Sequence, residues 1–274
     1  MAVDPIDYWR HDAGPRWVRG QAAIDHMFAP ITEDLVQATD VRPEENAIDI
    51  GCGSGTVTIR LADAVGPRGS VLGIDISDPL LAHAKERTRH LSQVRLICED
   101  ATSYPFVAGE ARAMCSRFGV MFFHRPVDAF RNLRQALETD GRFVFACWQA
   151  VEKNPWVRFM MDAFPDAPTK PPPDGDQPGP FRLAPPKRIE SLLTEAGFGA
   201  FELTSCVQGI SLGESPEAAL VGLSEVGPFS RLLAAATKEE RPAVLTRGRK
   251  HLEAYFSRGA PPVEAAYWRV IARP

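Results

Sequence analysis

The stretch Ile48-Asp49-Ile50-Gly51-Cys52-Gly53-Ser54-Gly55-Thr56 decides the fold. Apolar residues typical of a short buried strand run into three alternating glycines, and a segment with helical spacing begins at Thr56. Glycines at such a turn allow backbone angles closed to other residues and a close approach to a ligand. The helix that follows offers free N–H groups and the positive end of its dipole. The stretch therefore predicts a strand–loop–helix unit that binds a ligand.

A carboxylate follows this loop at the spacing of a nucleoside-binding site. Asp75 ends the apolar segment Leu72-Gly73-Ile74-Asp75-Ile76, 24 residues after Gly51. A carboxylate at the end of a second strand can accept hydrogen bonds from both ribose hydroxyls of a nucleoside cofactor. A surface aspartate that caps the next helix is the alternative, but Asp78 is the better candidate for that position. We therefore predict that Asp75 binds ribose.

The chemistry of the loop separates two classes of cofactor. Dinucleotide enzymes carry GxGxxG, whose third glycine allows helix–sheet packing beside a pyrophosphate. Here Thr56 follows the last glycine of the loop, and the acidic Asp49 precedes the first. An acid at this point disfavours a pyrophosphate, whereas carbonyls and carboxylates can bind the ammonium of an amino acid. These residues favour S-adenosylmethionine over a nicotinamide dinucleotide.

Strands and helices alternate around this unit. Strands are expected at 47–50, 70–74, 94–98, 112–118 and 142–148, with a turn at Asp140-Gly141, and helices at 56–65, from Asp78, and at 126–137. Helices are also expected within 6–40, one beginning at Pro30, then at 187–196 and within 215–257, with strands at 200–207 and 265–272. Such alternation predicts βαβ units and hence an α/β fold with a parallel sheet and helices on both faces.

Five segments resemble the motifs of class I S-adenosylmethionine-dependent methyltransferases, in order and over about residues 45–150. They are Asp49–Gly55, Gly73–Ser77, Cys98–Ala101, Ser116–Phe123 and Asp140–Phe145. Tyr8-Trp9, Trp17 and Asp25–Pro30 are similar to the N-terminal helices of UbiE-like small-molecule methyltransferases, which cover the cofactor pocket. The resemblance implies a Rossmann-like sheet of seven strands in the order 3-2-1-4-5-7-6, with the last strand antiparallel.

The resemblance also implies which residues bind the cofactor. Asp100 would meet the adenine amino group and the backbone N–H of Ala101 a ring nitrogen, while the segment from Ser116 would lie beside the methionine part. The full set expected to bind S-adenosylmethionine is Trp17, Asp49, Gly51, Cys52, Gly53, Gly55, Thr56, Asp75, Ile76, Asp100, Ala101, Ser116, Arg117 and Phe118. Arg117 could instead pair with a carboxylate of the substrate.

The chain is interpreted as one methyltransferase domain, because no linker divides it. Residues 1–40 would form a helical lid and residues 45–150 the cofactor-binding core. Residues 150–186 and 213–260 would be insertions that cover the acceptor. Nine of the 24 prolines lie between Pro165 and Pro186, which predicts a long loop or flap there. Aromatic residues expected near the acceptor, among them Trp148, Trp156 and Phe181, suggest an apolar acceptor site.

Methyl transfer from a sulfonium needs in-line alignment and exclusion of water, and a general base only when the acceptor must lose a proton. His124, just past the fourth strand, is the first candidate for such a base, and His26 the second. An exposed polar turn is the other interpretation of His124. The Asn/Asp-Pro-Pro-aromatic motif typical of nitrogen methylation is absent after that strand. Clustered carboxylates are absent there too, so no metal is predicted.

The amino-acid composition limits the kinds of partner that the chain is expected to have. A net charge of −4 and interspersed basic runs give no nucleic-acid footprint. The N-terminal residues do not resemble a signal peptide, and no stretch reaches the ~18 apolar residues that span a bilayer. Five cysteines without metal or disulfide spacing fit a reducing compartment, so we expect a cytoplasmic protein with no membrane insertion. A small-molecule acceptor is the expected partner, and a homodimer is compatible with the sequence.

The sequence thus predicts an enzyme that methylates a small, largely apolar metabolite, at oxygen in preference to nitrogen, with carbon and sulfur open. One alternative is a protein that binds S-adenosylmethionine without catalysis, as a sensor or a partner subunit. The other is a nicotinamide-dependent reductase, which would need the missing GxGxxG loop.

Overall fold

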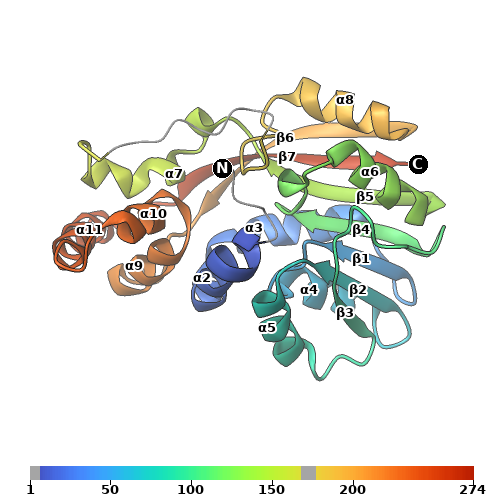
Figure 1. Cartoon of the computed structure of the whole chain (residues 1–274), viewed down its shortest axis with the longest axis horizontal. Helices are drawn as coiled ribbons and strands as arrows, with labels where there is room; N and C mark the ends of the chain where they lie inside the picture. Colours follow the sequence, from blue (N-terminus) through green and yellow to red (C-terminus); the bar gives the residue numbers. More distant parts are fainter. Residues whose placement is uncertain (1–6, 168–176) are drawn as a thin grey trace.

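The computed structural model describes residues 7–167 and 177–274 and is built around one seven-stranded sheet (Figure 1). Its strands lie in the order β3-β2-β1-β4-β5-β7-β6, as the resemblance implied. Their bounds are β1 Asn46–Ile50, β2 Ser70–Asp75, β3 Val94–Cys98, β4 Ala111–Arg117, β5 Leu137–Trp148, β6 Ala200–Ile210 and β7 Val263–Arg273.

The pairing of the strands confirms a mostly parallel sheet. β1 lies between β2 and β4 and is parallel to both, and β2–β3 and β4–β5 are parallel as well. β7 is antiparallel to both of its neighbours, β5 and β6. The expected turn at Asp140-Gly141 lies inside β5, whose register against β4 shifts between Ala111 and Ala113. The carboxyl ends of β1, β2, β4 and β5 therefore meet at one edge, where open α/β sheets bind ligands.

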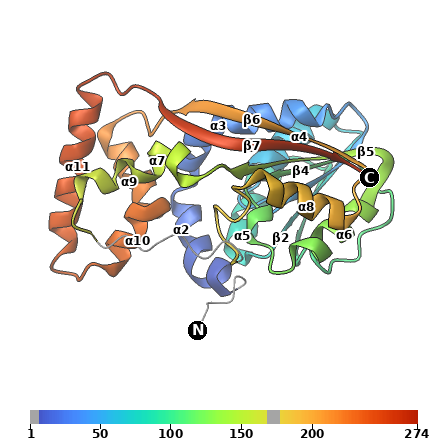
Figure 2. The ribbon, with the colours of Figure 1, turned by 90° about the horizontal axis from the view of Figure 1, so that it is seen from above.

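Helices cover both faces of the sheet, as Figures 1 and 2 show. α3 and α4 lie on one face, and α6 and α8 on the other. The longer helices are α2 Gly14–Arg19, α3 Gln21–Thr39, α4 Thr56–Val65, α5 Asp78–Thr88, α6 Pro126–Ala136, α7 Pro155–Phe159, α8 Pro186–Ala196, α9 Pro216–Glu225, α10 Gly227–Ala235 and α11 Arg241–Phe256. Other helical segments are the π-helix η1 Tyr8–Ala13 and the short 3₁₀ helices η2 Val120–Phe122, η3 Val151–Lys153 and η4 Met161–Ala163.

Two local predictions about helix starts are wrong. Pro30 lies inside α3 rather than at the start of a helix. Pro30 has no N–H and cannot donate a backbone hydrogen bond within the helix. The helix continues past it because α3 has a continuous buried face, which includes Met27 and Ile31. Asp78 is the first residue of α5 and caps nothing. Its carboxylate accepts a hydrogen bond from Cys98 Sγ (2.9 Å) and pairs with Arg10 (3.5 Å).

The helices α7, α9, α10 and α11 gather beyond one end of the sheet (Figure 2). In the described part of the chain, no single helix is long and apolar enough to cross a membrane. Only α9 and α10 taken together reach the required length, and they are bent by 73°. The expected proline-rich loop is described up to residue 167 and from residue 177, and residues 168–176 lie outside the described chain.

Candidate cofactor and acceptor site

The glycine loop connects β1 to α4 at the carboxyl edge of the sheet. Gly51, Gly53 and Gly55 have φ angles of 67°, 52° and 80°, a region that side chains with a Cβ rarely adopt. A Cβ added to Gly53 would meet no atom within 4 Å, so the space above the loop is open. The loop thus presents backbone, without side chains, toward the cavity.

Asp75 is held in place by this loop before any ligand binds. Its Oδ2 accepts a hydrogen bond from Gly53 N (2.8 Å), and its Oδ1 accepts one from Ser77 N (2.9 Å). Burial raises the pKa of Asp75, and these backbone bonds act in the opposite direction. The carboxylate at the end of β2 is therefore fixed in orientation beside the loop, as a group that is to bind a ribose requires.

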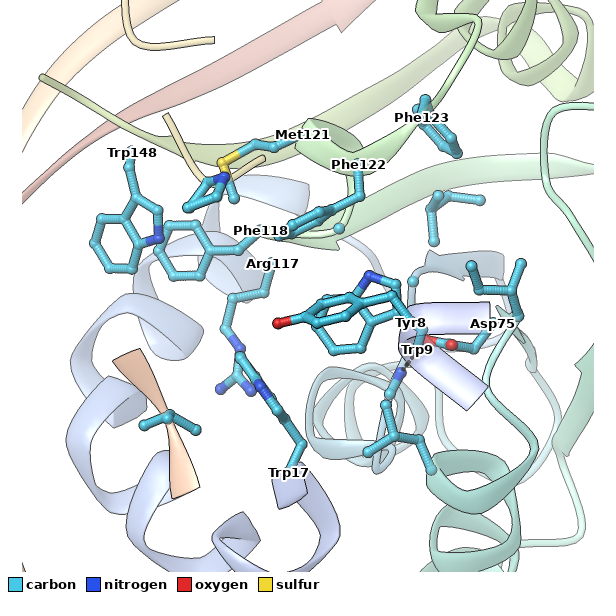
Figure 3. Close-up of a pocket in the computed structure, with 18 of the residues that line it drawn as sticks. Tyr8, Trp9, Trp17, Asp75, Arg117, Phe118, Met121, Phe122, Phe123 and Trp148 are labelled. Carbon is cyan, nitrogen blue, oxygen red and sulfur yellow. Dashed lines mark hydrogen bonds between the residues drawn. The ribbon is translucent and has the colours of Figure 1, made fainter. Parts of the chain in front are cut away.

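A cavity of about 300 Å³ extends from Asp75 across the glycine loop to the ends of β4 and β5. Figure 3 shows Asp75 on one side of it and Arg117, Phe118 and Trp148 on the other. The cofactor-binding residues expected from the sequence that do line the cavity are Trp17, Gly51, Gly53, Asp75, Ile76, Asp100, Ala101, Arg117 and Phe118.

Five expected cofactor-binding residues do not line this cavity. The Asp49 carboxylate is buried behind the loop and accepts a hydrogen bond from Thr58 Oγ1 (2.6 Å). Ser116 is also buried and donates to Ile50 O (2.7 Å). The remaining three, Cys52, Gly55 and Thr56, pack under the loop, and Thr56 donates to a carboxylate of α3. A strand and a tight loop have two sides, and motif position does not tell which side faces a ligand.

The second half of the cavity is aromatic. It is formed by Phe28, Phe118, Phe122, Phe123, Trp148, Trp156 and Phe181, which we call the aromatic half. Phe118 stacks on Trp148 with ring centroids 3.8 Å apart and an angle of 14° between the rings. Phe118 has a φ of 66°, a strained value for a bulky residue, and such strain concentrates at binding sites. The backbone at the end of β4 is thus held so that this ring faces the tryptophan.

The N-terminal turn η1 also contributes aromatic rings. Tyr8 and Trp9 line the cavity, and Trp9 makes edge contacts with Trp17 (5.6 Å) and Phe122 (5.2 Å). In the view of Figure 3, Tyr8 and Trp9 lie between Arg117 and Asp75. Ser77 Oγ donates to Trp9 O (2.8 Å), which joins this turn to the loop that follows Asp75. The turn therefore contributes two of the aromatic rings that line the cavity.

The two candidate histidines have different positions. His124 lines the cavity, although its side chain is exposed at the rim. His26 does not line it: the side chain is exposed on α3 and lies 3.1 Å from Ser211 Oγ. His26 therefore lies away from this cavity, because its turn of α3 faces the β6–α9 connection. Within the described ranges, no three His, Cys, Asp or Glu side chains gather as a metal site.

Sequence reasoning missed several residues of the cavity. Phe28 lies in the segment Asp25–Pro30 but was not itself predicted, and the α9–α10 junction, which contributes Val226, Gly227, Pro228 and Arg231, has no recognisable motif. Trp148, Trp156 and Phe181 were suspected only from their aromatic character, and all three line the cavity. Glu99 and Thr102 flank the expected Asp100-Ala101 pair and could have been found from it.

Part of the chain is similar to known methyltransferases. Residues 47–141 match the family model described as a methyltransferase domain. A demethylmenaquinone methyltransferase of Staphylococcus carnosus is 31% identical over 110 residues, which are 40% of this chain and 46% of that protein. The chain spans less than half the length of the curated relatives it first matches.

Solved structures share the fold at low sequence identity. The YcgJ protein of Bacillus subtilis superposes with a TM-score of 0.58 at 16% identity, over 89% of this chain and 98% of that one. Phosphoethanolamine N-methyltransferase 2 of Haemonchus contortus, in complex with S-adenosylhomocysteine, gives a TM-score of 0.60 at 15% identity, over 99% of this chain and 60% of that one.

The sheet order, the glycine loop and the matched domain together define the class. Residues 47–141 are a methyltransferase domain of the S-adenosylmethionine-dependent class, within a Rossmann-like class I fold. The elements η1, α2 and α3 before this domain and the helices α7–α11 after it lie outside the matched segment.

Proposed function

We propose that this chain transfers the methyl group of S-adenosylmethionine to a small, largely apolar metabolite. One observation carries the proposal: a single cavity joins the glycine loop and Asp75 to the aromatic half. A methyltransferase needs this continuity, because the acceptor atom must approach the sulfonium methyl group in line and away from water. A protein that only bound the cofactor would not need a second, aromatic chamber.

The residues on the loop side suit S-adenosylmethionine. Both oxygens of Asp75 are already oriented by backbone N–H groups and keep lone pairs free for ribose hydroxyls. Asp100 and Ala101 line the cavity directly after β3, where an adenine would lie next to that ribose. When bound, the cofactor supplies an electrophilic methyl group on a positively charged sulfur. The chain's own residues bind it, orient it and exclude water.

The residues on the acceptor side suit an apolar molecule. The aromatic half carries rings from α3, β5, α7 and the segment that follows β4, and Phe28 contacts Phe118, Trp148 and Trp156 at centroid distances of 5.5–5.7 Å. Among the described residues that line the cavity on the side away from Asp75, the charged or titratable side chains are Arg117, His124 and Arg231, and none of them is a carboxylate that could bind an amine. The naming of relatives as demethylmenaquinone methyltransferases supports a small-molecule acceptor.

Oxygen is the acceptor atom that the site favours. The end of β4 carries Arg117-Phe118-Gly119 instead of the proline-containing motif of nitrogen methylation. A hydroxyl must lose its proton near neutral pH, and His124 at the rim can accept that proton. Carbon of an activated ring is the next choice, since it needs a similar base and the same apolar walls.

The test combines binding and turnover. Calorimetric titration with S-adenosylmethionine, S-adenosylhomocysteine and NADH is expected to show binding of the two sulfur nucleosides only. Asp75→Ala is expected to weaken both, whereas Asp63→Ala, at an exposed position of α4, leaves them unchanged. Formation of S-adenosylhomocysteine is then measured with a panel of phenols and quinols.

The outcomes separate the alternatives. Turnover on any apolar acceptor supports the enzyme. Binding without turnover across phenols, quinols, thiols and amines supports a non-catalytic sensor or partner subunit. Failure of folded protein to bind either sulfur nucleoside would overturn the proposal, and binding of NADH would point to a reductase.

A further inference from the structure

Arg231 of α10 brings a positive charge to the rim of the cavity. Its side chain is exposed, and it lines the cavity together with the residues of the α9–α10 junction. The carboxylate that precedes it most closely in the sequence, that of Glu225, is already bound by Arg19 through two hydrogen bonds (2.8 and 3.1 Å). Within residues 7–167 and 177–274, the Arg231 guanidinium has no hydrogen bond and no ion pair. It is therefore free to bind an anionic group of a ligand.

The charged side chains that line the cavity are separated by sign. The carboxylates lie at the ends of β2 and β3 and belong to Asp75, Glu99 and Asp100. They are close together, since Glu99 N donates to Asp75 O (3.0 Å). Figures 1 and 2 both show α10 on the side of the molecule opposite to these two strands. Among the described lining residues, Arg231 thus lies away from the carboxylates, and a positive group without a negative neighbour attracts an anion.

The other guanidinium in the cavity, that of Arg117, already has partners within the chain. It donates to Thr32 Oγ1 (2.7 Å) and lies 3.7 Å from a carboxylate oxygen of Asp25, and only 13% of its side chain is exposed. Arg231 differs in both respects, because it is exposed and has no partner in the described part of the chain. An anionic group that reaches the rim would therefore bind Arg231 without breaking an existing ion pair.

The packing of α10 holds Arg231 beside the aromatic half. Phe229, two residues earlier, is buried, and its ring centroid lies 5.8 Å from that of Phe164. α10 also contacts α7, the helix that contributes Trp156 and Val157 to the cavity. A molecule whose rings occupy the aromatic half can therefore extend to Arg231 at the rim.

We propose that the acceptor is an apolar ring compound with a carboxylate at the end away from the methylated atom, and that Arg231 binds this carboxylate. The inference rests on the proposed function and narrows its substrate class. The aromatic half would hold the rings, and the guanidinium would form paired hydrogen bonds with the two carboxylate oxygens. Because Arg231 lies at the rim, the carboxylate would keep part of its contact with water while the rings are buried.

Two probes that differ in one group test this inference. A hydroxynaphthoate with its hydroxyl and its carboxylate on opposite rings has the expected features, and the corresponding hydroxynaphthamide has nearly the same shape without the charge. Each probe is titrated by calorimetry into protein saturated with S-adenosylhomocysteine. Wild type is expected to bind the carboxylate about 5- to 20-fold more tightly, between the effects of a surface ion pair and of a buried charge-assisted hydrogen bond. High salt should reduce this ratio of dissociation constants, because it screens an exposed ion pair.

Substitutions at position 231 show whether this side chain causes the preference. Arg231→Gln is expected to bring the ratio close to one, and Arg231→Glu to reverse it, so that the amide binds more tightly. Arg158→Gln is the matched control, because Arg158 is an exposed arginine of α7 that does not line the cavity. The same loss of charge there should leave the ratio unchanged. Where the hydroxynaphthoate is methylated, Arg231→Gln should raise its KM by the same factor and leave kcat unchanged, since the carboxylate does not take part in the reaction.

Three results would overturn the inference. The first is equal binding of the two probes by wild type, and the second is binding of neither probe by wild type that binds S-adenosylhomocysteine. The third is an unchanged ratio in folded Arg231→Gln. Failure of folded wild type to bind S-adenosylhomocysteine would instead refute the proposed function, and the inference with it.

Discussion

Asp49→Asn tests the consequence of burying a carboxylate behind the glycine loop. Asp49 is 1% exposed, and its one side-chain partner is the Thr58 hydroxyl. Burial raises its pKa from 3.8 to about 7. The folded state thus binds this proton more tightly than the unfolded chain does. Protonation of Asp49 therefore stabilises the folded state fully below pH 3.8, and this contribution is lost as the pH rises through about 7.

The size of the effect follows from the two pKa values. They differ by about 3 pH units, at about 1.4 kcal/mol each, so ionisation of Asp49 costs the fold about 4 kcal/mol at pH 8. Asparagine has nearly the same shape, carries no charge and can still accept the Thr58 hydrogen bond. The variant should match wild type near pH 4 and become more stable than wild type, by up to about 4 kcal/mol, between pH 4 and pH 8.

Urea denaturation at intervals from pH 4 to pH 8 measures this difference. Asp63→Asn, at an exposed position of α4, is the control and should show no such trend. A difference between Asp49→Asn and wild type that stays constant over the whole range would refute the reasoning. The same variant should lose preference for S-adenosylmethionine over S-adenosylhomocysteine above pH 7, because an ionised Asp49 attracts the sulfonium charge.

Three further predictions concern the walls of the cavity. Gly119→Ala would place a Cβ 2.9 Å from Ile50 O and 3.2 Å from Gly51 Cα. The free energy of unfolding, measured by urea denaturation, should fall by about 1–3 kcal/mol, and an unchanged urea midpoint would contradict this. Asn154→Ala removes a buried amide that bonds Ala266 N (2.9 Å) and Trp156 Nε1 (3.0 Å). It should cost about 2–4 kcal/mol and shift tryptophan emission, whereas unaltered emission would argue against this support of Trp156. His124→Gln should lower turnover of a hydroxyl acceptor about 10²- to 10⁴-fold with S-adenosylhomocysteine affinity unchanged, and full turnover would exclude it as the base.

The sequence by itself determined the elements and the cofactor class. The alternation of apolar segments with glycine turns predicted α4 and β3 to the residue, because helix starts, stops and buried strands depend on neighbours within a few positions. The glycine loop and the position of Asp75 can be predicted from neighbouring sequence in the same way. They need only a strand before the loop, a helix after it and a carboxylate at the next strand end.

Predictions from the local sequence failed where contacts between segments far apart in the chain determine the structure. Pro30 is tolerated inside α3 because the buried face of that helix packs on the sheet. His26 and Asp25 are adjacent in sequence, yet one is exposed beside Ser211 and the other lies beneath the glycine loop. A helix sends adjacent side chains in different directions, and only the docked helix shows which side faces the site.

The tertiary structure alone decided the composition of the cavity. Arg117 approaches Asp25 across 92 positions of the chain, and the lining of the cavity combines residues of α3, β5 and α7, of the segment after β4 and of the α9–α10 junction. It also decided that Asp49 and Ser116 lie behind the loop, although their motif positions match those of cofactor-binding residues. Such contacts form between segments far apart in sequence, so they depend on how whole elements pack and leave no periodic signal in any one of them.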